Sequence, residues 1–562
     1  MRTPAALLLW PVALLGLASA LGAAPAPDGA AYAHVTLAST TDLHGRIYPV
    51  DYSNDFPYEG GLAKISSVLQ RLRSDDPRLL LVDSGDTLEG NPLVYFHARR
   101  NNAPIDPMML VMNYLHYDSM ALGNHDFNFG LAVQDKAHAE ARFPWISANI
   151  YRKDTGQSAY TPYIVKEVKG VRIGILGLTT PGVPYWDGPE NYPGLEFREP
   201  VAEARKWVAV LRRDEHVDAV VITMHMGLEQ NLGTGATAVG AVPNENRAIA
   251  IAREVPGVDL ILMGHTHQDV PNLVVNGVLL AQAGRWGDHL IKADLYFERA
   301  GGGAWQVTAK SSVSLSMQGV TPDPEVLRLA KPYHEETERW LSQPVGTCDR
   351  DLDSRSNFAD SAMLDLVQRV QLEAGSADVS LASVFNPQAR IHAGQTTVRE
   401  LAALYVYENT LVVVQATGRQ LKEALEHSAR FFLPYAPGKT LSQLVNPDFY
   451  LYNFDKAEGV SYEMDISRPY GDRIQHLMYH GAPLQPDQTF RLAMNNYRYS
   501  GGGGYAMFKT APVVMRASVP IRDLLIDWVE RHHVIPSTPV NNWRIVGVGS
   551  ADVNSPLATP TY

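Results

Sequence analysis

The chain has 562 residues, and a single hydrophobic core stops growing well below this length, so a one-domain architecture is excluded. A formal net charge of -12 excludes a broad electrostatic grip on nucleic-acid polymers, which requires a surplus of Lys and Arg, but leaves single nucleotides possible as ligands. Cys348 is the only cysteine, so no disulfide can form within the chain.

The N-terminus has the pattern of a secretory signal peptide. Arg2 is followed by an apolar run over residues 5–21 and by small residues at 18–24. Pro11 interrupts the apolar run, which disfavours a retained membrane anchor. We therefore predict that residues 1–24 are removed on export, and that the mature protein is periplasmic or secreted with no stable membrane anchor.

Residues 30–320 alternate short apolar runs with helical stretches such as residues 61–73 and 201–213. Each apolar run ends in polar residues. This alternation is typical of strands packed between layers, and it predicts an α/β domain whose strand ends gather at one sheet edge. The predicted strands are residues 35–38, 79–82, 120–122, 171–178, 219–223 and 260–263.

A connecting helix is predicted near the middle of the chain, within a linker at residues 321–345. It starts at the Pro-Asp-Pro-Glu sequence of residues 322–325, and we expect Pro332 to interrupt it. A second, mixed α+β domain is predicted over residues 346–549, and a flexible tail rich in Ser, Pro and Thr over residues 550–562. Within the second domain we predict helices at residues 361–374 and 418–430 and a strand at residues 410–416.

Side chains that can bind metal follow five of the predicted strands. Taken singly, each cluster has a plain structural interpretation, and a lone histidine such as His225 is more often a hydrogen-bonded residue than a ligand. Together the clusters are hard to explain in that way, because each falls close to a strand end. They are Asp42-Leu43-His44, Ser84-Gly85-Asp86, Gly123-Asn124-His125-Asp126, His225 and Gly264-His265-Thr266-His267.

The types of ligand in these clusters restrict the metal and the substrate. Oxygen and imidazole ligands without thiolate suit Zn, Mn, Co or Fe and disfavour a structural zinc site. If Asp42 and Asp86 are the only anionic ligands of two divalent ions, an excess of about two positive charges is left. This charge balance favours a phosphate ester as the substrate.

At these residues the sequence resembles the calcineurin-like metallophosphoesterases, and specifically the 5′-nucleotidase family. The resemblance implies a four-layer α/β/β/α metallophosphoesterase domain followed by a C-terminal α+β substrate-binding domain. It also implies that two divalent metal ions share Asp86 as a bridge. Asp83 competes for that role but matches the Gly-Asp pattern less well, so we expect it behind the ligands. The implied ligands are Asp42, His44 and His267 for one ion and Asn124, His225 and His265 for the other.

In this family the His of the Gly-Asn-His motif contacts the phosphoryl group, which implies that His125 is the transition-state stabiliser or general acid. Many members have an acid three residues later that holds this His, whereas this chain has Asn128. An amide can orient the ring without raising its basicity as a carboxylate does. Asp126 is the alternative partner.

Two tyrosines of the C-terminal region are candidates for binding a nucleobase. Tyr452 and Tyr497 lie in separate loops, and stacking on a base contributes on the order of 1–3 kcal/mol. Composition alone does not distinguish this role from ordinary packing. The resemblance favours a base clamp, because both segments match the places where family members hold the base.

Two departures from the family pattern bear on the substrate. Gly503 stands where typical 5′-nucleotidases have the carboxylate that holds the ribose hydroxyls, although these glycines also suit a tight turn. Family members have a glycine-rich stretch that ends in Arg. In this chain the only obvious counterpart of that stretch is Arg390. A pocket without the carboxylate at position 503 can accept a phosphate on those hydroxyls, which favours cyclic or 3′ substrates.

These features are most similar to the 2′,3′-cyclic-nucleotide 2′-phosphodiesterase/3′-nucleotidase branch. We therefore predict an exported hydrolase of nucleoside phosphate esters that acts on 2′,3′-cyclic nucleotides and 3′-nucleotides. A 5′-nucleotidase or UDP-sugar hydrolase is the alternative. A non-catalytic nucleotide-binding protein is disfavoured, because every metal position has a suitable ligand.

Overall fold

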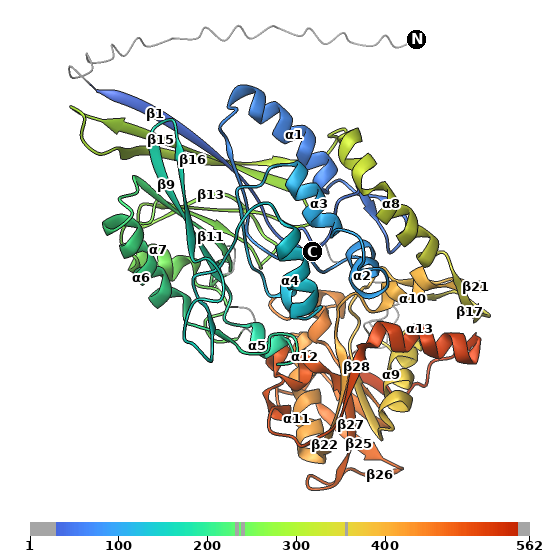
Figure 1. Cartoon of the computed structure of the whole chain (residues 1–562). Coiled ribbons are helices and arrows are strands. Elements are labelled where there is room, and N and C mark those ends of the chain that lie inside the picture. Colours follow the sequence, from blue (N-terminus) through green and yellow to red (C-terminus); the bar gives the residue numbers. More distant parts are fainter. Residues whose placement is uncertain (1–29, 231–234, 236, 238–241, 354–357, 549–562) are drawn as a thin grey trace, which may run out of the picture.

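The computed structural model describes residues 30–230, 235, 237, 242–353 and 358–548. The predicted signal peptide and the predicted tail lie outside these residues. Among the described helices, none has the length and apolar character needed to cross a membrane. Figure 1 shows an N-terminal part in blue and green and a C-terminal part in orange and red.

The N-terminal part is built on two six-stranded sheets. In spatial order the first sheet comprises β16 (Gln306–Ser316), β15 (His289–Arg299), β1 (Ala31–Thr40), β4 (Leu80–Asp83), β5 (Ser119–Ala121) and β6 (Trp145–Ile146). The second comprises β13 (Asp269–Val275), β14 (Val278–Ala283), β12 (Leu260–Met263), β11 (Ala219–His225), β9 (Val171–Thr179) and β8 (Tyr163–Val168). All six predicted strands are confirmed.

The N-terminal part has four layers, because side chains of successive strand residues pack on opposite faces of each sheet. Leu80 and Val82 of β4 pack with Val221 of β11 in the core between the sheets. Leu81 points the other way and belongs to the core under α1 (Leu62–Asp75) and α3 (Pro107–Tyr114). Residues of α6 (Pro200–Arg213) and α7 (Ala248–Glu254) form a third core with the outer face of the second sheet. Because successive strand residues face opposite sides, these short apolar runs produce the predicted α/β/β/α architecture.

The parallel strands place their carboxyl ends at one edge of the two sheets. β1, β4 and β5 are parallel neighbours in the first sheet, and β9, β11 and β12 are parallel neighbours in the second. The residues that follow β1, β4, β5 and β12, and the last residue of β11, are the predicted ligand clusters. The fold therefore positions these clusters together, as open α/β sheets do with their sites.

Helix α8 (Pro324–Leu341) connects the two parts, and the expected interruption at Pro332 is wrong. Asp323 caps the helix by accepting from the Glu325 N–H at 2.9 Å. A proline inside a helix removes one backbone hydrogen bond. The buried side chains on both sides of it, from Val326 to Leu341, hold the helix against the N-terminal part.

The C-terminal part has a mixed five-stranded sheet covered by helices. In spatial order the strands are β23 (Lys456–Glu458), β19 (Val379–Ala382), β27 (Thr489–Asn495), β22 (Thr410–Thr417) and β28 (Val513–Pro520). Helices α9 (Ala362–Gly375), α11 (Gly418–Ser428) and α13 (Ile521–His532) pack against this sheet. The two helices and the strand predicted here are confirmed, with α11 ending two residues early.

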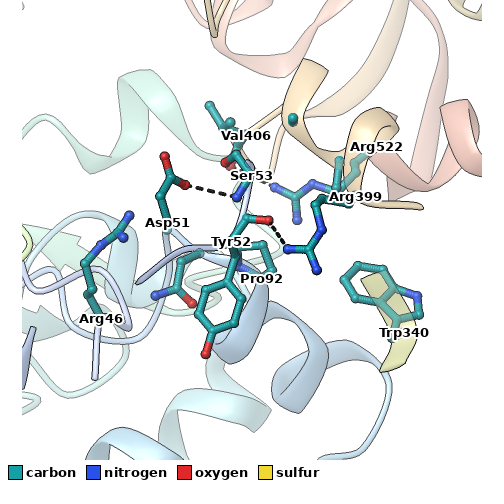
Figure 2. Close-up of a pocket in the computed structure, with 13 residues that line it drawn as sticks. Arg46, Asp51, Tyr52, Ser53, Pro92, Trp340, Arg399, Val406 and Arg522 are labelled. Atoms are coloured by element: carbon teal, nitrogen blue, oxygen red, sulfur yellow. Dashed lines mark hydrogen bonds between the residues drawn. The ribbon is translucent and has the colours of Figure 1, made fainter. Parts of the chain in front are cut away.

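The two parts are in direct contact. Tyr95 of α2 (Pro92–Arg99) donates a hydrogen bond to Asp523 of α13, and Arg399 donates to the Tyr52 carbonyl at 2.6 Å. A cavity of about 40 Å³ lies in this interface. Figure 2 shows Arg399 and Arg522 entering it from the C-terminal part, opposite Tyr52. The interface continues to the strand ends, where the predicted ligands lie.

Candidate metal centre and catalytic site

The structure brings six of the predicted ligands into two adjacent groups. In each group, one nitrogen or carboxylate oxygen per residue lies within 4.8 Å of the other two. Asp86 lies between the groups, because its Oδ2 is 2.9 Å from His225 Nε2 and 3.8 Å from His44 Nε2. The groups are Asp42, His44 and His267, and Asp86, His225 and His265.

Most of these residues have a backbone conformation that non-glycine residues rarely adopt. Such left-handed conformations cost on the order of 1–3 kcal/mol each and persist only where surrounding contacts hold them. Here the Asp42 N–H donates to the Gly85 carbonyl and the His44 N–H to the Asp86 carbonyl, both at 2.9 Å. The φ angles are 50° for Asp42, 47° for His44, 59° for Asp86, 74° for His265 and 56° for His267.

Three of the histidines are oriented through the ring nitrogen that faces away from the centre. Each donates that N–H to an oxygen, and in His44 and His225 the other nitrogen, Nε2, faces Asp86 Oδ2. Metal-binding histidines are commonly held in this way. The bonds are His44 Nδ1 to the Glu89 carbonyl at 2.8 Å, His225 Nδ1 to the Ser84 carbonyl at 2.8 Å and His265 Nε2 to Glu245 Oε1 at 3.1 Å.

Among the described residues at this centre, the buried Asn124 Oδ1 has no hydrogen-bond partner. An unpaired buried acceptor costs about 1–3 kcal/mol, so such an atom calls for an explanation. A divalent cation satisfies it, since an amide oxygen is a suitable ligand, and His225 Nε2, which faces Asp86 Oδ2 at 2.9 Å, is a second atom that such a cation can bind. The donor set therefore fits the metal ions that the sequence predicts.

The electrostatics of the centre also favour a cation. Burial opposes protonation of His225, but the carboxylates of Asp86 and Asp42 outweigh it and raise the pKa of His225 to about 10. The site therefore stabilises a positive charge beside these two carboxylates. Burial lowers the pKa of His44 to about 3, which keeps that ring neutral and able to act as a ligand.

His125 lies beside the two groups and is held from behind by an amide. Its Nδ1 donates to Asn128 Oδ1 at 2.6 Å, and Glu89 Oε2 lies 3.2 Å from the same nitrogen. Tyr407 of the C-terminal part stacks over the ring, with centroids 6.4 Å apart. The backbone N–H of His125 donates to Asp86 Oδ1 at 2.8 Å, which ties the residue to the metal centre.

Asp126, the alternative partner of His125, has a different role. Its carboxylate accepts hydrogen bonds from four backbone N–H groups, those of Asp86, Thr87, Leu88 and Gly123. It therefore fixes the loop that carries Asp86, and the proposed pairing with the His125 ring is wrong.

Asp83 lies behind the ligands, as expected. Its carboxylate accepts from Thr40 Oγ1 at 2.6 Å and from the Gly85 N–H at 2.8 Å. Burial raises the pKa of Asp83 to about 7.

Glycine is required at Gly123, next to the metal centre, because a Cβ there would lie 2.1 Å from Asp86 Oδ1.

The two candidate base-binding tyrosines lie in short helices, Tyr452 in η4 (Leu451–Asn453) and Tyr497 in α12 (Asn496–Tyr499), that are joined to each other. Arg498, which follows Tyr497, donates to Asn453 Oδ1 at 3.2 Å and to the Tyr452 carbonyl. Burial, together with neighbouring Tyr497 and Tyr407, raises the pKa of Tyr452 well above its usual value. Tyr450 stacks on one face of the Tyr452 ring at 5.2 Å.

Gly503 adopts a left-handed conformation with φ of 67°. A Cβ at this position would lie 2.2 Å from Asn453 Oδ1, so the tight-turn interpretation of this glycine is confirmed. Arg390 donates hydrogen bonds to the carbonyls of Pro387 and Ala389 in its own loop. Its role toward a substrate stays a prediction.

Several residues at this site were not identified from the sequence. Glu89 and Asp187 lie behind His125, and Glu245 orients His265. The Trp186 ring lies 5.2 Å from that of His265, and Tyr407 covers His125. In the sequence, the Gly-Asp-Thr-Leu-Glu segment of residues 85–89 is the one pattern that points to Glu89. The other residues reach the site through tertiary packing, which no local sequence pattern indicates.

Comparisons with known proteins agree with this architecture. Residues 35–269 match the calcineurin-like phosphoesterase family, and residues 344–510 match the 5′-nucleotidase C-terminal domain. A 2′,3′-cyclic-nucleotide 2′-phosphodiesterase/3′-nucleotidase of Salmonella typhimurium is 30% identical over 93% of this chain and 90% of its own length. The trifunctional nucleotide phosphoesterase protein YfkN of Bacillus subtilis is also 30% identical, over 99% of this chain, which spans 42% of that longer protein.

A solved structure shows the same fold. The crystal structure of a 5′-nucleotidase precursor from Thermus thermophilus has a TM-score of 0.66 and 24% identity, covering 92% of this chain and 99% of its own. The two family matches occur in the predicted order, and the Salmonella relative is matched almost end to end. The chain therefore belongs to the 5′-nucleotidase family of calcineurin-like phosphoesterases and is a phosphoric ester hydrolase.

Proposed function

We propose that this protein is an exported hydrolase that uses two divalent metal ions to cleave 2′,3′-cyclic nucleotides and 3′-nucleotides. The observation that carries the proposal is the convergence of the predicted ligands beside His125, next to tyrosines of the C-terminal part. The similarity to relatives with that activity in their names supports the choice of substrate. In this proposal residues 1–24 are the signal peptide, residues 30–320 and 346–549 are the two domains, and 321–345 link them.

The two groups support an assignment of metal ligands. Asp42, His44 and His267 would hold one ion, and His225, His265 and Asn124 the other, with Asp86 shared. Bound ions of Zn, Mn, Co or Fe would neutralise the phosphate and supply a nucleophile at neutral pH. The outer hydrogen bonds of His44, His225 and His265 keep one nitrogen of each ring directed at the centre, so little reorganisation is needed when a metal ion binds.

The remaining residues act on the substrate directly. With both ring nitrogens protonated, His125 would donate a hydrogen bond from Nε2 to the phosphoryl group and then the Nε2 proton to the leaving oxygen, which leaves a neutral ring with its proton on Nδ1. Tyr452 and Tyr497 would hold the base, with Tyr450 supporting the outer face of Tyr452. With glycine at position 503 and Asn453 filling the space beside it, a carboxylate from residue 503 is absent from the ribose pocket. Ribose hydroxyls that carry a phosphate would therefore meet less repulsion.

A substrate panel tests this proposal. Protein stripped of metal and then reloaded with Mn or Zn is given 2′,3′-cyclic AMP, 3′-AMP, 5′-AMP and UDP-glucose, and kcat/KM is measured for each. We expect the first two to exceed 5′-AMP by about 10-fold or more, the size of one lost polar contact. Turnover of 5′-AMP or UDP-glucose alone would support the alternative. Binding of nucleotides without turnover of any of them would support a non-catalytic protein.

A further inference from the structure

Behind His125 the structure contains a second hydrogen bond that continues away from the active site. Asn128 uses both ends of its amide: Oδ1 accepts from His125 Nδ1 at 2.6 Å, and Nδ2 donates to Asp187 Oδ2 at 3.0 Å. Asp187 lies 59 residues further along the chain, directly after α5 (Val183–Trp186). These three residues therefore form a chain of side chains that ends on His125.

Asp187 is buried and surrounded by donors. The residue is 4% exposed, and besides Asn128 it accepts hydrogen bonds at Oδ1 from Asn191 Nδ2 at 2.6 Å and the Gly188 N–H at 2.9 Å. Each of these contacts is from an N–H group to a carboxylate oxygen. Burial raises the pKa of Asp187 to about 6, so the ionised form predominates at neutral pH, and that form offers no donor to any neighbour.

This arrangement fixes the orientation of the Asn128 amide. An amide can be rotated by 180° about its last bond with little change in shape, which exchanges its donor and acceptor. Because Asp187 only accepts, the NH₂ group must face Asp187 and the oxygen must face His125. The oxygen then requires a proton on Nδ1 of His125, and Nε2 is left directed toward the site.

The segment that carries Asp187 is itself held in place. The carbonyl of Trp186 accepts from Asn496 Nδ2 of the C-terminal part at 3.4 Å, and Lys509 lies 4.3 Å from the Tyr185 ring. On its other side the Trp186 ring packs 5.2 Å from that of His265. Asp187 therefore starts from a fixed backbone, as a group that orients others must.

We propose that Asp187 is a positioning residue that sets the orientation of the Asn128 amide and, through it, the tautomer and tilt of His125. This inference rests on the proposed function, in which His125 acts on the phosphoryl group. Asn128 and Asp187 orient the ring, and the Glu89 carboxyl lies 3.2 Å from the same Nδ1.

A reciprocal exchange of the two side chains tests the relay. In Asp187→Asn, Asn191 Nδ2 and the Gly188 N–H still donate to the oxygen of the new side chain. The new NH₂ group therefore faces Asn128, and the Asn128 amide rotates by 180° so that its oxygen accepts from that group. The flipped amide presents a donor to His125 Nδ1. We expect kcat on 3′-AMP to fall by about 10-fold or more, with KM within about 2-fold of wild type and metal content unchanged.

In the double variant Asn128→Asp with Asp187→Asn, the acceptor faces His125 again. The amide at 187 donates to the carboxylate at 128, which accepts from Nδ1. We expect kcat to recover to within about 3-fold of wild type. The single variant Asn128→Asp places two carboxylates where a donor and an acceptor met at 3.0 Å, and we expect it to be at least about 5-fold slower than the double variant.

The controls separate this inference from the proposed function. Asp154→Asn, on an exposed loop of the N-terminal part, is expected to match wild type. If wild-type protein hydrolyses no nucleotide, the proposed function fails. If it is active and Asp187→Asn leaves kcat unchanged, the relay is overturned. A double variant no faster than either single variant, or a loss of kcat that follows loss of metal or of Tm, would also overturn it.

Discussion

Asp86→Asn is expected to weaken binding of both metal ions by more than about 100-fold and to abolish measurable turnover. The side chain lies between the two ligand groups, with Oδ2 2.9 Å from His225 Nε2 and 3.8 Å from His44 Nε2. An amide keeps the shape but removes the negative charge that two cations would share. The measurement is metal content per chain after gel filtration, together with kcat on 3′-AMP.

A matched control is available for the backbone. Asp55 has the same φ as Asp86, 59°, but is exposed, lies in a surface turn and belongs to neither ligand group. Asn tolerates this conformation well, so Asp55→Asn should retain wild-type metal content and activity. Full metal occupancy and normal turnover in Asp86→Asn would contradict the assignment of Asp86 as the shared ligand.

His125→Gln is expected to lower kcat by about 10²- to 10⁴-fold while leaving both metal ions bound. The ring acts on the substrate, whereas the contact of this residue with Asp86 is made by its backbone N–H and survives the substitution. The expected pattern is therefore the reverse of that for Asp86: chemistry is lost and metal is retained. Single-turnover kinetics at saturating substrate measure the chemical step directly.

The comparison variant for this substitution is His216→Gln, at an exposed histidine of the same part of the chain. It should have no effect on kcat. Loss of bound metal in His125→Gln would mean that His125 is itself a ligand. A fall in kcat of less than about 5-fold would remove it from the chemistry altogether.

The strands and the ligands could be predicted from the sequence because both depend on local patterns. Short apolar runs such as residues 219–223 have few alternatives to a buried strand, and parallel strands bring their ends to one edge. The polar residues after each run, such as Asp42 and His265, must then meet. Their side-chain chemistry restricts what they bind without further knowledge of the fold.

The support of the site could not be predicted in this way. Asp187 and Glu245 reach His125 and His265 from other loops, and their approach depends on tertiary packing. The left-handed conformations of Asp42, His44 and Asp86 are imposed by hydrogen bonds between distant loops rather than by residue type. Non-glycine residues rarely adopt these backbone conformations. Functional sites are where such departures from residue preference are expected.

Two of the expectations failed for identifiable physical reasons. Pro332 does not interrupt α8, because buried contacts along the helix outweigh one missing hydrogen bond. Asp126 does not hold the His125 ring, because four backbone N–H groups of the Asp86 loop and its surroundings use its carboxylate. In both cases the competing contacts come from other elements of the fold, which a local sequence pattern does not describe.

Anomalous diffraction from crystals of the wild-type protein grown with Mn or Zn locates the bound metal ions directly. We expect two peaks about 3.5–4 Å apart, one next to Asp42, His44 and His267 and one next to Asn124, His225 and His265, with Asp86 contacting both. Peaks located elsewhere, or a fully loaded and active protein with a single ion, would contradict this expectation.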